Sequence, residues 1–468
     1  MINIKNFLNK LSEFRSTVYV IGDCMVDEYF DIEANRISPE FPIAVMRSAH
    51  EEPTVRVPGG AGNAVRQFVN FNVNVEFFGL LDDKGRQCLN DWNISTQHCV
   101  DLPDGKHIPV KKRLYNGAFP LCRWDIEESL YGLSHGQLIN YQEELLKKYK
   151  LSPTPNVIIL SDYDKGLFVN KNYAAFTDWF YRDDVISIID PKKGPIDKWR
   201  KCSIFKPNAK EALELSGGLT DWRKQCDYFQ ARLDCVAIVI TNSDKGVMGK
   251  VKEKYFEYQT SSSVTAESVI GAGDCFVAFM AMGLATGMDI EHVVEVAYEA
   301  GKAYVQRKHN KPLTPYDLLR HADPIEAKMV KPEFLKNRDF KLAMTNGCFD
   351  FGLTSAHIKS LQYAKACGDK LVVAINSDAS VELLKGSGHP IMSLEERMLV
   401  VAGLECVDFV VSFDESTHVE MIKTMHPEFL IKGGDYQAEN VIGYGIVPII
   451  IHPIFEGIST TEKLKRNS

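Results

Sequence analysis

Several features that would at once assign a chain to a class of protein are missing from this sequence. Its 468 residues include 11 cysteines, but no two lie closer together than Cys226 and Cys235, so a CxxC motif for a metal or a redox pair is absent. The longest apolar stretches, such as 275–285, fall far short of the roughly 18–20 residues that a membrane-spanning helix needs. The N-terminal segment has no apolar core of the kind found in signal peptides, so secretion is not expected.

A strong excess of either charge is also lacking. Lysine and arginine number 54 against 62 aspartates and glutamates, which gives a formal net charge of −8. This balance offers no basic footprint for nucleic acid or for an anionic membrane, so neither is expected as a partner. With 45% hydrophobic and 25% charged residues, the composition is that of an ordinary globular protein. An odd number of well-separated cysteines fits reduced thiols, and we therefore expect a cytoplasmic protein.

What the sequence does contain is an alternation of short β-branched runs with longer amphipathic stretches. Runs such as 157–160 and 236–240 predict buried strands, and stretches such as 170–181 and 290–307 predict helices. This alternation predicts an α/β fold with a mainly parallel sheet covered on both faces.

The alternation is interrupted once, by a polar stretch that contains proline, and then begins again. We expect a large α/β domain over 1–318, a linker over 319–338 and a smaller α/β domain over 339–468. The helical part of the linker, 325–334, could instead dock on either domain.

The most informative segment of the first half is SVIGAGDCFVAFMAMG at 268–283, where an apolar helix carries Asp274 in its first turn. Three small residues precede this carboxylate: Gly271, Ala272 and Gly273. A helix N-terminus presents unpaired N–H groups to a phosphate, and a carboxylate in that turn can accept a proton from an attacking hydroxyl. The alternative is a glycine-rich turn with Asp274 as an ordinary helix-start residue.

Other polar residues of this half follow strands or tight turns, where open α/β sheets bind their ligands. The segment VIGDCMVDEYF is predicted as one strand whose two carboxylates hold sugar hydroxyls, and VPGGAGNAVRQF as a turn that opens a helix. The candidates for sugar contacts are Asp23, Asp27, Gly59, Gly60 and Asn63. The candidates for nucleotide contacts are Asn208 and Glu211, three apart on one helix face, with Thr241 and Gly246. A GxxxxGK[ST] loop is absent, which excludes a P-loop kinase.

A group of cations in VKKRLYNGAFPLCRW could bind a phosphate on the substrate itself. Its members are Lys111, Lys112, Arg113 and Arg123. Arginine can hold phosphate oxygens with two donors, whereas lysine acts as a point charge. The alternative is a solvated basic edge of a β-sheet.

Together these motifs resemble the ribokinase-like (PfkB) sugar kinases over residues 15–310. RISPEFPIAV, SDYDKG and DPKK are similar to the kinase half of bacterial bifunctional heptose kinase/adenylyltransferases. The resemblance implies a ribokinase-like domain with a β-lid, with Asp274 as the base and the small residues before it as the anion hole. It also implies that Asn208 and Glu211 position Mg²⁺-ATP, with Glu211 as the metal-associated residue. Cys275 stands where this family usually has threonine.

The second half opens with MTNGCFDFGLTSAHIKS, which predicts a strand, a tight turn and a helix. The candidates for nucleotide binding near that strand and helix are Thr345, Asn346, Gly347, Phe349, Thr354 and His357. Further candidates downstream are Lys385, Arg397, Lys432, Gly433, Ser459, Thr460 and Thr461. A helix start combined with hydroxyls and lysines suits a triphosphate.

TNGCFD, NSD, LKG, KGGDY and STT resemble the cytidylyltransferase-like nucleotidyltransferases, and specifically the adenylyltransferase half of the same heptose enzymes. The resemblance implies a Rossmann-like domain with His357 and Thr354 in catalytic positions. The family motif HxGH is altered here, because Thr354 replaces the first histidine, Ala356 replaces the glycine and one extra residue precedes the motif.

The two resemblances imply a bifunctional transferase that makes ADP-heptose, a surface-glycan precursor, from ATP with Mg²⁺. The first half would phosphorylate the anomeric hydroxyl of D-glycero-β-D-manno-heptose 7-phosphate, and the second would join heptose 1-phosphate to AMP with release of pyrophosphate. The resemblance also implies a homodimer formed through the β-lid. Two alternatives are a kinase with an inactive second domain that serves as an interaction module, and a bifunctional enzyme for another sugar phosphate or for CTP.

Overall fold

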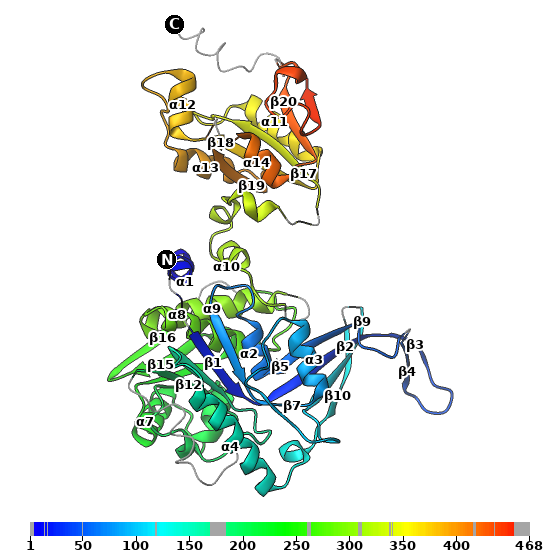
Figure 1. Cartoon of the computed structure of the whole chain (residues 1–468), viewed down its shortest axis with the longest axis vertical. Helices are drawn as coiled ribbons and strands as arrows, with labels where there is room; N and C mark the ends of the chain where they lie inside the picture. Colours follow the sequence, from blue (N-terminus) through cyan, green and yellow to red (C-terminus); the bar gives the residue numbers. More distant parts are fainter. Residues whose placement is uncertain are drawn as a thin grey trace. The chain divides into compact units, whose positions relative to one another are not determined.

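The computed structural model of the chain describes residues 4–13, 15, 17–48, 50–117, 119–168, 184–259, 264–307, 311–336, 338, 340–414, 418–434 and 436–453. The helix expected over 170–181 lies outside these residues, as do Ser459, Thr460 and Thr461. The chain divides into two compact units, Met1–Leu318 and Leu319–Ser468, which are described in turn (Figure 1).

The first unit is built on an eight-stranded sheet. In spatial order its strands are β16 (Lys254–Tyr258), β15 (Val247–Val251), β14 (Ala237–Thr241), β13 (Ile204–Phe205), β12 (Ile186–Asp190), β11 (Val157–Ser161), β1 (Thr17–Gly22) and β6 (Asn74–Phe78). The strands from β6 to β14 are parallel, and β15 and β16 are antiparallel. Every residue of β11 is buried, as expected of a parallel strand covered on both faces.

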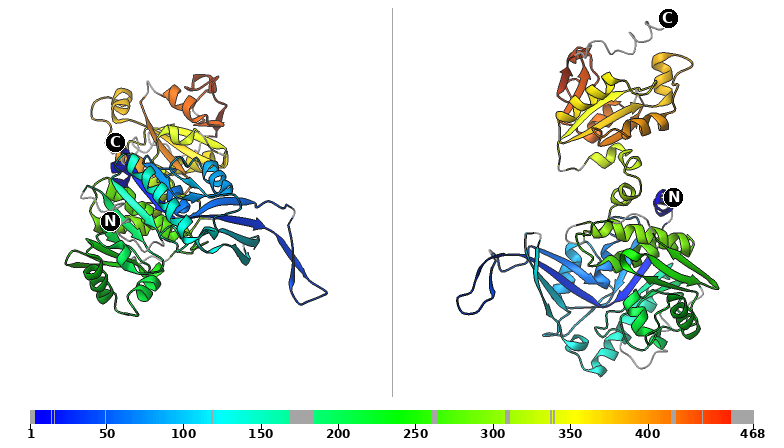
Figure 2. Two further views of the ribbon diagram at one scale, coloured as in Figure 1. Left: turned by 60° about the horizontal axis from the view of Figure 1, so that its bottom comes forward. Right: turned by 180° about the vertical axis from the view of Figure 1, so that it is seen from behind.

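Helices lie on both faces of this sheet (Figures 1 and 2). On one face are α8 (Ala272–Ala285) and α9 (Ile290–Val305), and α1 (Ile4–Glu13) packs on α8 through Phe7 and Phe279. On the other face are α4 (His135–Leu151) and α7 (Trp222–Leu233). Within the part of the chain that the structure describes, no helix is both long enough and apolar enough to cross a bilayer.

A second, four-stranded sheet extends from the first unit as a lid. Its strands in spatial order are β10 (Phe119–Ile126), β9 (Val110–Asn116), β2 (Cys24–Asp31) and β5 (Val55–Gly60). Beyond it projects a hairpin of β3 (Glu33–Ile37) and β4 (Ala44–Arg47), which both views of Figure 2 show clear of the domain.

The expectation of one strand over 20–30 is wrong, because the chain leaves the main sheet at Asp23 and continues in the lid. The crossing passes close to β11: a Cβ on Gly22 would lie 2.4 Å from the carbonyl oxygen of Ser161. Glycine is therefore required at this position, and the buried carboxylate of Asp23 marks the corner between the two sheets.

The second unit is built on a five-stranded parallel sheet. Its strands in spatial order are β19 (Phe409–Phe413), β18 (Lys370–Asn376), β17 (Leu342–Gly347), β20 (Phe429–Gly433) and β21 (Ile449–His452). The helices between the strands are α11 (Ser355–Ala366), α12 (Asp378–Lys385), α13 (Leu394–Ala402) and α14 (His418–Met425). Leu361, Val373 and Val401 belong to the core between the sheet and the helices. A mainly parallel α/β fold in both halves was predicted and is confirmed.

The stretch expected as a linker, 319–338, begins inside α10 (Pro315–Ala322) and contains two short 3-10 helices, Glu326–Lys328 and Pro332–Leu335. Met329 pairs with Val410 beside β19, and the Lys328 ammonium donates to the carbonyl of Leu404 at 2.8 Å. The part beyond residue 325 therefore packs on the second unit.

A fragment that ends after α10, at residue 322, should fold and retain the sugar-kinase activity that its sequence predicts. Leu318 is fully buried in the core of the first unit, and Asp317 pairs with Arg307 at 2.5 Å, so this helix belongs in the fragment. Circular dichroism during heating should show one cooperative transition. Aggregation of the fragment beside a well-behaved full-length chain would instead mean that the two units share a core.

Candidate active sites

The first site is built around the start of α8. Gly271 caps this helix with a left-handed φ of 77°, and a Cβ on it would lie 2.4 Å from Nδ2 of Asn63, so both conformation and packing require glycine. A Cβ on Gly273 would meet no atom within 4 Å, so the helix start is open there. Ala272 begins the helix between them, and the N–H groups of a first turn have no partners within the helix. The segment can thus present its backbone to an anion.

Asp274, in the same turn, is only 4% exposed and is held by two donors. Nδ2 of Asn63 donates to Oδ2 at 2.7 Å, and the hydroxyl of Tyr163 donates to Oδ1 at 2.7 Å. Arg66 donates to the other end of the Asn63 amide at 2.8 Å, which fixes the orientation of that amide. Burial raises the pKa of Asp274 to about 6, and the bonds from Asn63 and Tyr163 oppose this rise. The carboxylate is therefore ionised at neutral pH and still basic enough to accept a proton.

Charged side chains line the neighbouring carboxyl ends of the parallel strands. Asp190, which ends β12, pairs with the buried Lys206 at 2.9 Å, and Glu211 pairs with Lys192 at 2.8 Å. Burial raises the pKa of Asp190, and Lys206 opposes this rise. Asp190 also raises the pKa of Asp274 and Lys206 lowers it, so the two groups lie within electrostatic reach of the first site.

Asn208 and Glu211 do not project from one face of a helix, because together they form the start of α6 (Ala209–Leu215). Oδ1 of Asn208 accepts from the backbone N–H of Glu211, and Oε2 of Glu211 accepts from the backbone N–H of Asn208, both at 2.9 Å. Thr241 pairs with Asn208 through a parallel bridge, so two of the predicted nucleotide residues lie side by side. Gly246 has a φ of 102°, and a Cβ on it would lie 2.2 Å from the carbonyl oxygen of Tyr258, so it serves the β14–β15 turn.

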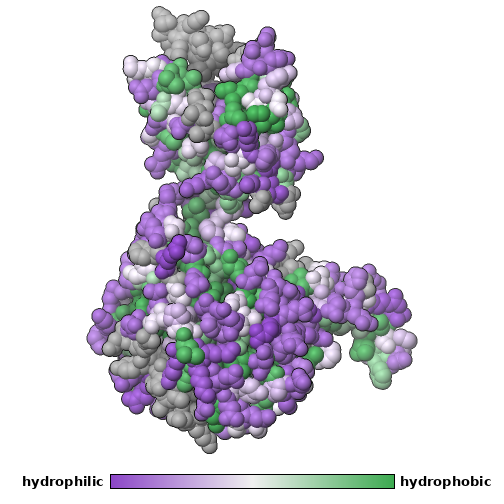
Figure 3. Space-filling model, in the orientation of Figure 1, coloured by the Kyte–Doolittle hydropathy of each residue, from purple (hydrophilic) through white to green (hydrophobic). Residues whose placement is uncertain are grey.

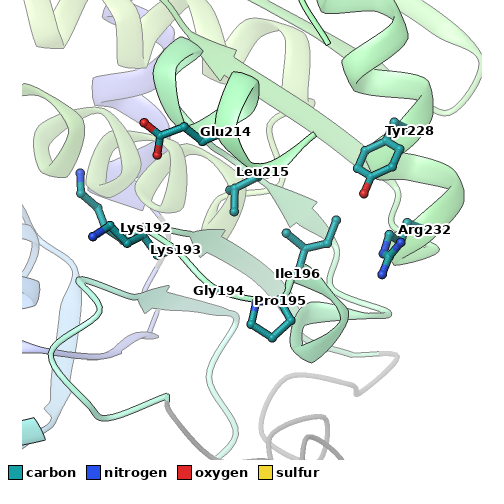
Figure 4. A pocket seen from close by; sticks show the side chains of 9 residues that line it. All are labelled: Lys192, Lys193, Gly194, Pro195, Ile196, Glu214, Leu215, Tyr228 and Arg232. Atoms are coloured by element: carbon teal, nitrogen blue, oxygen red, sulfur yellow. The ribbon is translucent and has the colours of Figure 1, made fainter. Parts of the chain in front are cut away.

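A cavity of about 380 Å³ lies beside this network (Figure 4). Lys192, whose ammonium bonds to Glu211, lines one side, and Tyr228 and Arg232 of α7 line the other. The remaining lining residues are Lys193, Gly194, Pro195, Ile196, Glu214 and Leu215. Asp274 is not among them, so the cavity adjoins the charged network and not the buried carboxylate.

The cations predicted to bind a phosphate lie on the lid, on β9 and β10. Because successive residues of a strand point to opposite faces, Lys111 and Arg113 share one face of β9 and Lys112 lies on the other. The ammonium of Lys112 lies over the rings of Phe30 and Trp124, at 5.6 and 5.2 Å. Lys112 is thereby separated from the other cations.

The face that carries Lys111 and Arg113 also carries Asp27. Arg113 donates to Asp27 at 2.6 Å, and both side chains are buried. Arg123 is opposite Arg113 in the register and donates to Asp125 at 2.6 Å. Burial lowers the pKa of Lys111, Asp27 opposes this and Arg123 adds to it, so these charges are close together. Three of the four predicted cations therefore surround one carboxylate.

The glycines of the lid hinge bring the main chain against this carboxylate. A Cβ on Gly59 would lie 2.8 Å from Oδ2 of Asp27. Gly60 has a φ of 58°, and a Cβ on it would lie 2.6 Å from the carbonyl oxygen of Asp23. Both glycines are therefore needed so that the main chain can pass close to Asp23 and Asp27.

Asp23 does not have oxygens free for sugar hydroxyls, contrary to the expectation from its sequence. Its side chain is fully buried and accepts four hydrogen bonds. The donors are the hydroxyl of Tyr131 at 2.6 Å and the backbone N–H groups of Tyr163 at 2.9 Å, Lys165 at 3.2 Å and Leu167 at 3.1 Å. A carboxylate has about four acceptor positions, so Asp23 is saturated by Tyr131 and by the loop that follows β11.

The second site lies at the carboxyl end of β17, where Thr345, Asn346 and Gly347 end the strand. The hydroxyl of Thr345 donates to the carbonyl of Ile431 at 2.9 Å, which ties β17 to β20. Oδ1 of Asn346 is buried and has no hydrogen-bond partner among the described residues. Since a buried acceptor without a partner is costly, this oxygen is suited to accept from a ligand.

Thr354 and His357 form the start of α11. The hydroxyl of Thr354 accepts from the backbone N–H of His357 at 3.3 Å, and Nδ1 of His357 accepts from the backbone N–H of Thr354 at 3.1 Å. An accepting Nδ1 places the ring proton on Nε2. Burial and the charge of Lys385 lower the pKa of His357, so the ring is neutral at pH 7. Phe349 packs edge-on against this ring at 5.4 Å.

The remaining predicted residues of this half are two lysines and Arg397. Lys385 bonds to Asp350 at 3.3 Å and its charge acts on His357. Lys432 lies at the end of β20, beside Gly433, with its ammonium 5.0 Å from the ring centre of Tyr436. Arg397 was expected to face a ligand, but it is buried and serves the protein. It donates to the carbonyls of Met392, Cys348 and Asn376 and to the carboxylate of Asp378.

Four residues of the first site were not predicted: Tyr163, Asp190, Lys192 and Lys206. Three of them lie within SDYDKG and DPKK, two motifs that carried the resemblance without a role for any of their residues. Lys206 directly precedes the Pro-Asn pair of α6, with no signal that it would be buried against Asp190.

Comparison with known proteins identifies a family for each half of the chain. Residues 15–315 match the pfkB family of carbohydrate kinases, and residues 344–461 match the cytidylyltransferase-like family. The chain therefore belongs to the pfkB carbohydrate kinases and carries a cytidylyltransferase-like domain as well. Phosphofructokinase-2 from Escherichia coli, solved with potassium, has the same fold: its TM-score is 0.54 at 17% identity, over 66% of this chain and 98% of that one.

Relatives that match the chain from end to end narrow the family further. The bifunctional protein HldE of Campylobacter jejuni subsp. doylei is 31% identical over 98% of this chain and 99% of its own length. The HldE protein of Geotalea uraniireducens is 32% identical over 99% and 98%. The chain is a member of the bifunctional HldE family, and both predicted resemblances are confirmed.

The start of α8 gives a matched pair of substitutions. Gly271→Ala should lower the stability of the first unit by about 1–3 kcal/mol, because alanine is strained at a φ of 77° and its Cβ meets Asn63. Gly273→Ala meets no protein atom and should leave the melting temperature unchanged or slightly higher. Thermal unfolding of both variants checks this, and equal melting temperatures would contradict the packing described here.

Proposed function

We propose that this chain catalyses two reactions of ADP-heptose synthesis. The first unit transfers the γ-phosphoryl group of ATP to the anomeric hydroxyl of D-glycero-β-D-manno-heptose 7-phosphate. The second joins heptose 1-phosphate to AMP from ATP and releases pyrophosphate. The observation that carries the kinase assignment is the buried Asp274 carboxylate at an open helix start, in a chain similar to HldE proteins over its whole length.

In the kinase reaction, the anomeric oxygen of the sugar attacks the γ-phosphorus and the bond from that phosphorus to ADP breaks. Asp274 accepts the hydroxyl proton, which its pKa of about 6 permits at neutral pH. The N–H groups at the start of α8 face the negative charge that develops on the phosphoryl oxygens. Asn63 and Tyr163 keep the carboxylate in one orientation during the transfer.

The lid supplies the contacts that distinguish a sugar phosphate from a free sugar. Lys111, Arg113 and Arg123 share one face with Asp27, so a phosphate can meet the cations while sugar hydroxyls meet the carboxylate. Arg113 is already paired with Asp27, which fixes both side chains before the substrate arrives.

We expect magnesium to enter with ATP, bound mainly by its phosphates. Among the described residues, no group of three or more histidine, cysteine, aspartate or glutamate side chains could hold a metal. Glu211 has one oxygen on a backbone N–H and the other on Lys192, so it can contribute at most a shared contact. Such sparse ligation fits Mg²⁺, which usually retains waters and binds through substrate phosphates.

In the second reaction, a phosphate oxygen of heptose 1-phosphate attacks the α-phosphorus of ATP and pyrophosphate leaves. His357 can donate from Nε2 to a phosphate oxygen, because its Nδ1 is occupied by Thr354. Thr354 caps α11, so its replacement of a histidine leaves the helix start intact. The altered motif therefore supports an active domain with a weaker hold on the triphosphate.

We also propose that the enzyme is a cytoplasmic homodimer. All eleven cysteines are free thiols, which suits a reducing compartment. The outer strand of the lid, β10, is exposed along its whole length, and Ile37, Phe41 and Ile43 of the projecting hairpin are 61–71% exposed. Figure 3 shows apolar surface at the end of this hairpin. Such an apolar surface favours a second copy as the partner.

Two substitutions should separate the two activities in the full-length chain. Asp274→Asn keeps the shape but cannot accept the proton, so sugar phosphorylation should fall about 10²–10⁴-fold while pyrophosphate release is unchanged. His357→Ala should lower pyrophosphate release from ATP and heptose 1-phosphate about 10–150-fold, with kinase activity unchanged.

If the Asp274→Asn variant phosphorylated the sugar at a near-normal rate, Asp274 would not be the general base. If the wild-type chain released no pyrophosphate at all, the second domain would instead be an inactive partner of the kinase.

A further inference from the structure

The loop after β11 brings one hydroxyl to the buried carboxylate of the kinase site. Tyr163 belongs to this loop, its side chain is half-buried, and its hydroxyl lies 2.7 Å from Oδ1 of Asp274. The contact joins residues 111 positions apart in the sequence. The other donor to Asp274, Asn63, belongs to a different element, α2 (Ala61–Arg66).

The loop itself is held by two further buried carboxylates. Asp23 accepts from the backbone N–H of Tyr163 at 2.9 Å and so fixes the residue at its main chain. Asp162 pairs with Lys198 at 2.6 Å, with both side chains buried, and also accepts from the backbone N–H of Asp164 at 2.9 Å. Asp164 has a left-handed φ of 57°, which makes the turn tight. The main chain on both sides of Tyr163 is therefore held by buried groups of the protein.

We propose that Tyr163 is a positioning residue of phosphoryl transfer, whose hydroxyl holds the Asp274 carboxylate in the orientation that accepts the sugar proton. The proposal rests on the proposed role of Asp274 as the base. It assigns a function to the saturated Asp23 as well, which anchors Tyr163 instead of binding the sugar. A rigid support of this kind matters because small displacements of a catalytic group cost much of the rate.

The same bond also determines when the base is ionised. A donor stabilises the charged carboxylate, so removing it raises the pKa of Asp274 further above its present value of about 6. The other titratable or charged groups that act on Asp274 or are acted on by it are Asp190, Lys192, Lys206, Cys275 and Tyr304. Burial raises the pKa of Tyr163 well above its usual range, so its own hydroxyl remains a donor throughout the pH range of an assay.

The test is the pH profile of kcat for sugar phosphorylation in the full-length chain, with saturating ATP, Mg²⁺ and heptose 7-phosphate. For Tyr163→Phe, the acidic limb should move to higher pH by roughly one unit, because one charge-assisted hydrogen bond is lost. At pH 7, kcat should fall about 10–100-fold and recover in part as the pH rises, with the KM for ATP nearly unchanged.

Tyr19→Phe is the matched control. Tyr19 is a buried tyrosine of the first unit whose hydroxyl donates to the carbonyl of Pro153 at 2.6 Å. Its ring packs against Phe78 and Tyr149 and not against Asp274. Loss of its hydroxyl should cost similar stability and leave the pH profile where it was. A second variant, with 3-fluorotyrosine at position 163, keeps the shape and strengthens the donor, so its acidic limb should move to lower pH.

An acidic limb that stays in place in both variants at position 163 would overturn the proposal, whatever the change in kcat. The same limb shift in Tyr19→Phe would also overturn it, because the effect would then follow from stability. If instead Asp274 is not the base, the Asp274→Asn variant will retain its kinase activity, which distinguishes that outcome from a failure of the proposal for Tyr163.

Discussion

The kinase half depends on keeping one carboxylate out of water without neutralising it. Burial raises the pKa of Asp274 to about 6, and no lysine or arginine is bonded to its oxygens in the described structure; two neutral donors, Asn63 and Tyr163, hold it instead. A salt bridge would have lowered the pKa and weakened the base, whereas a carboxylate without partners would have been protonated. Neutral hydrogen bonds give a pKa between these two extremes. This explains why α2 and the loop after β11 both supply a neutral donor to Asp274 at the start of α8.

Much of the surrounding fold follows from that convergence. Arg66 fixes the amide of Asn63, and a side chain larger than hydrogen at position 271 would clash with that amide. Asp23 binds the backbone N–H of Tyr163 at the corner where the chain leaves the main sheet for the lid. The lid that begins at this corner carries Asp27 and the cations of β9 and β10. The base and the substrate-facing surface of the lid are therefore linked through a few buried contacts.

The sequence predicted the parts of this arrangement that are local. The GAGD segment, buried strands such as 157–160 and 236–240, and the helix start at Thr354 follow from short-range pattern. Family models match both halves of the chain. Side-chain partners were predicted poorly: Asp23 is saturated by Tyr131 and by a loop about 140 residues away, and Arg397 serves three carbonyls. Lys112 was grouped with three cations although strand alternation places it on the opposite face. Contacts of this kind depend on register and on distant loops, which periodicity does not specify.

The most direct test of the account is to identify the product of the first reaction. The full-length chain is incubated with ATP, Mg²⁺ and D-glycero-β-D-manno-heptose 7-phosphate, and the phosphorus signals are followed by ³¹P NMR. We predict ADP in equal amount to a sugar bisphosphate whose new phosphate is coupled to the anomeric proton. ADP formed with free inorganic phosphate, or a new phosphate on any other carbon of the sugar, would contradict the assignment of this site.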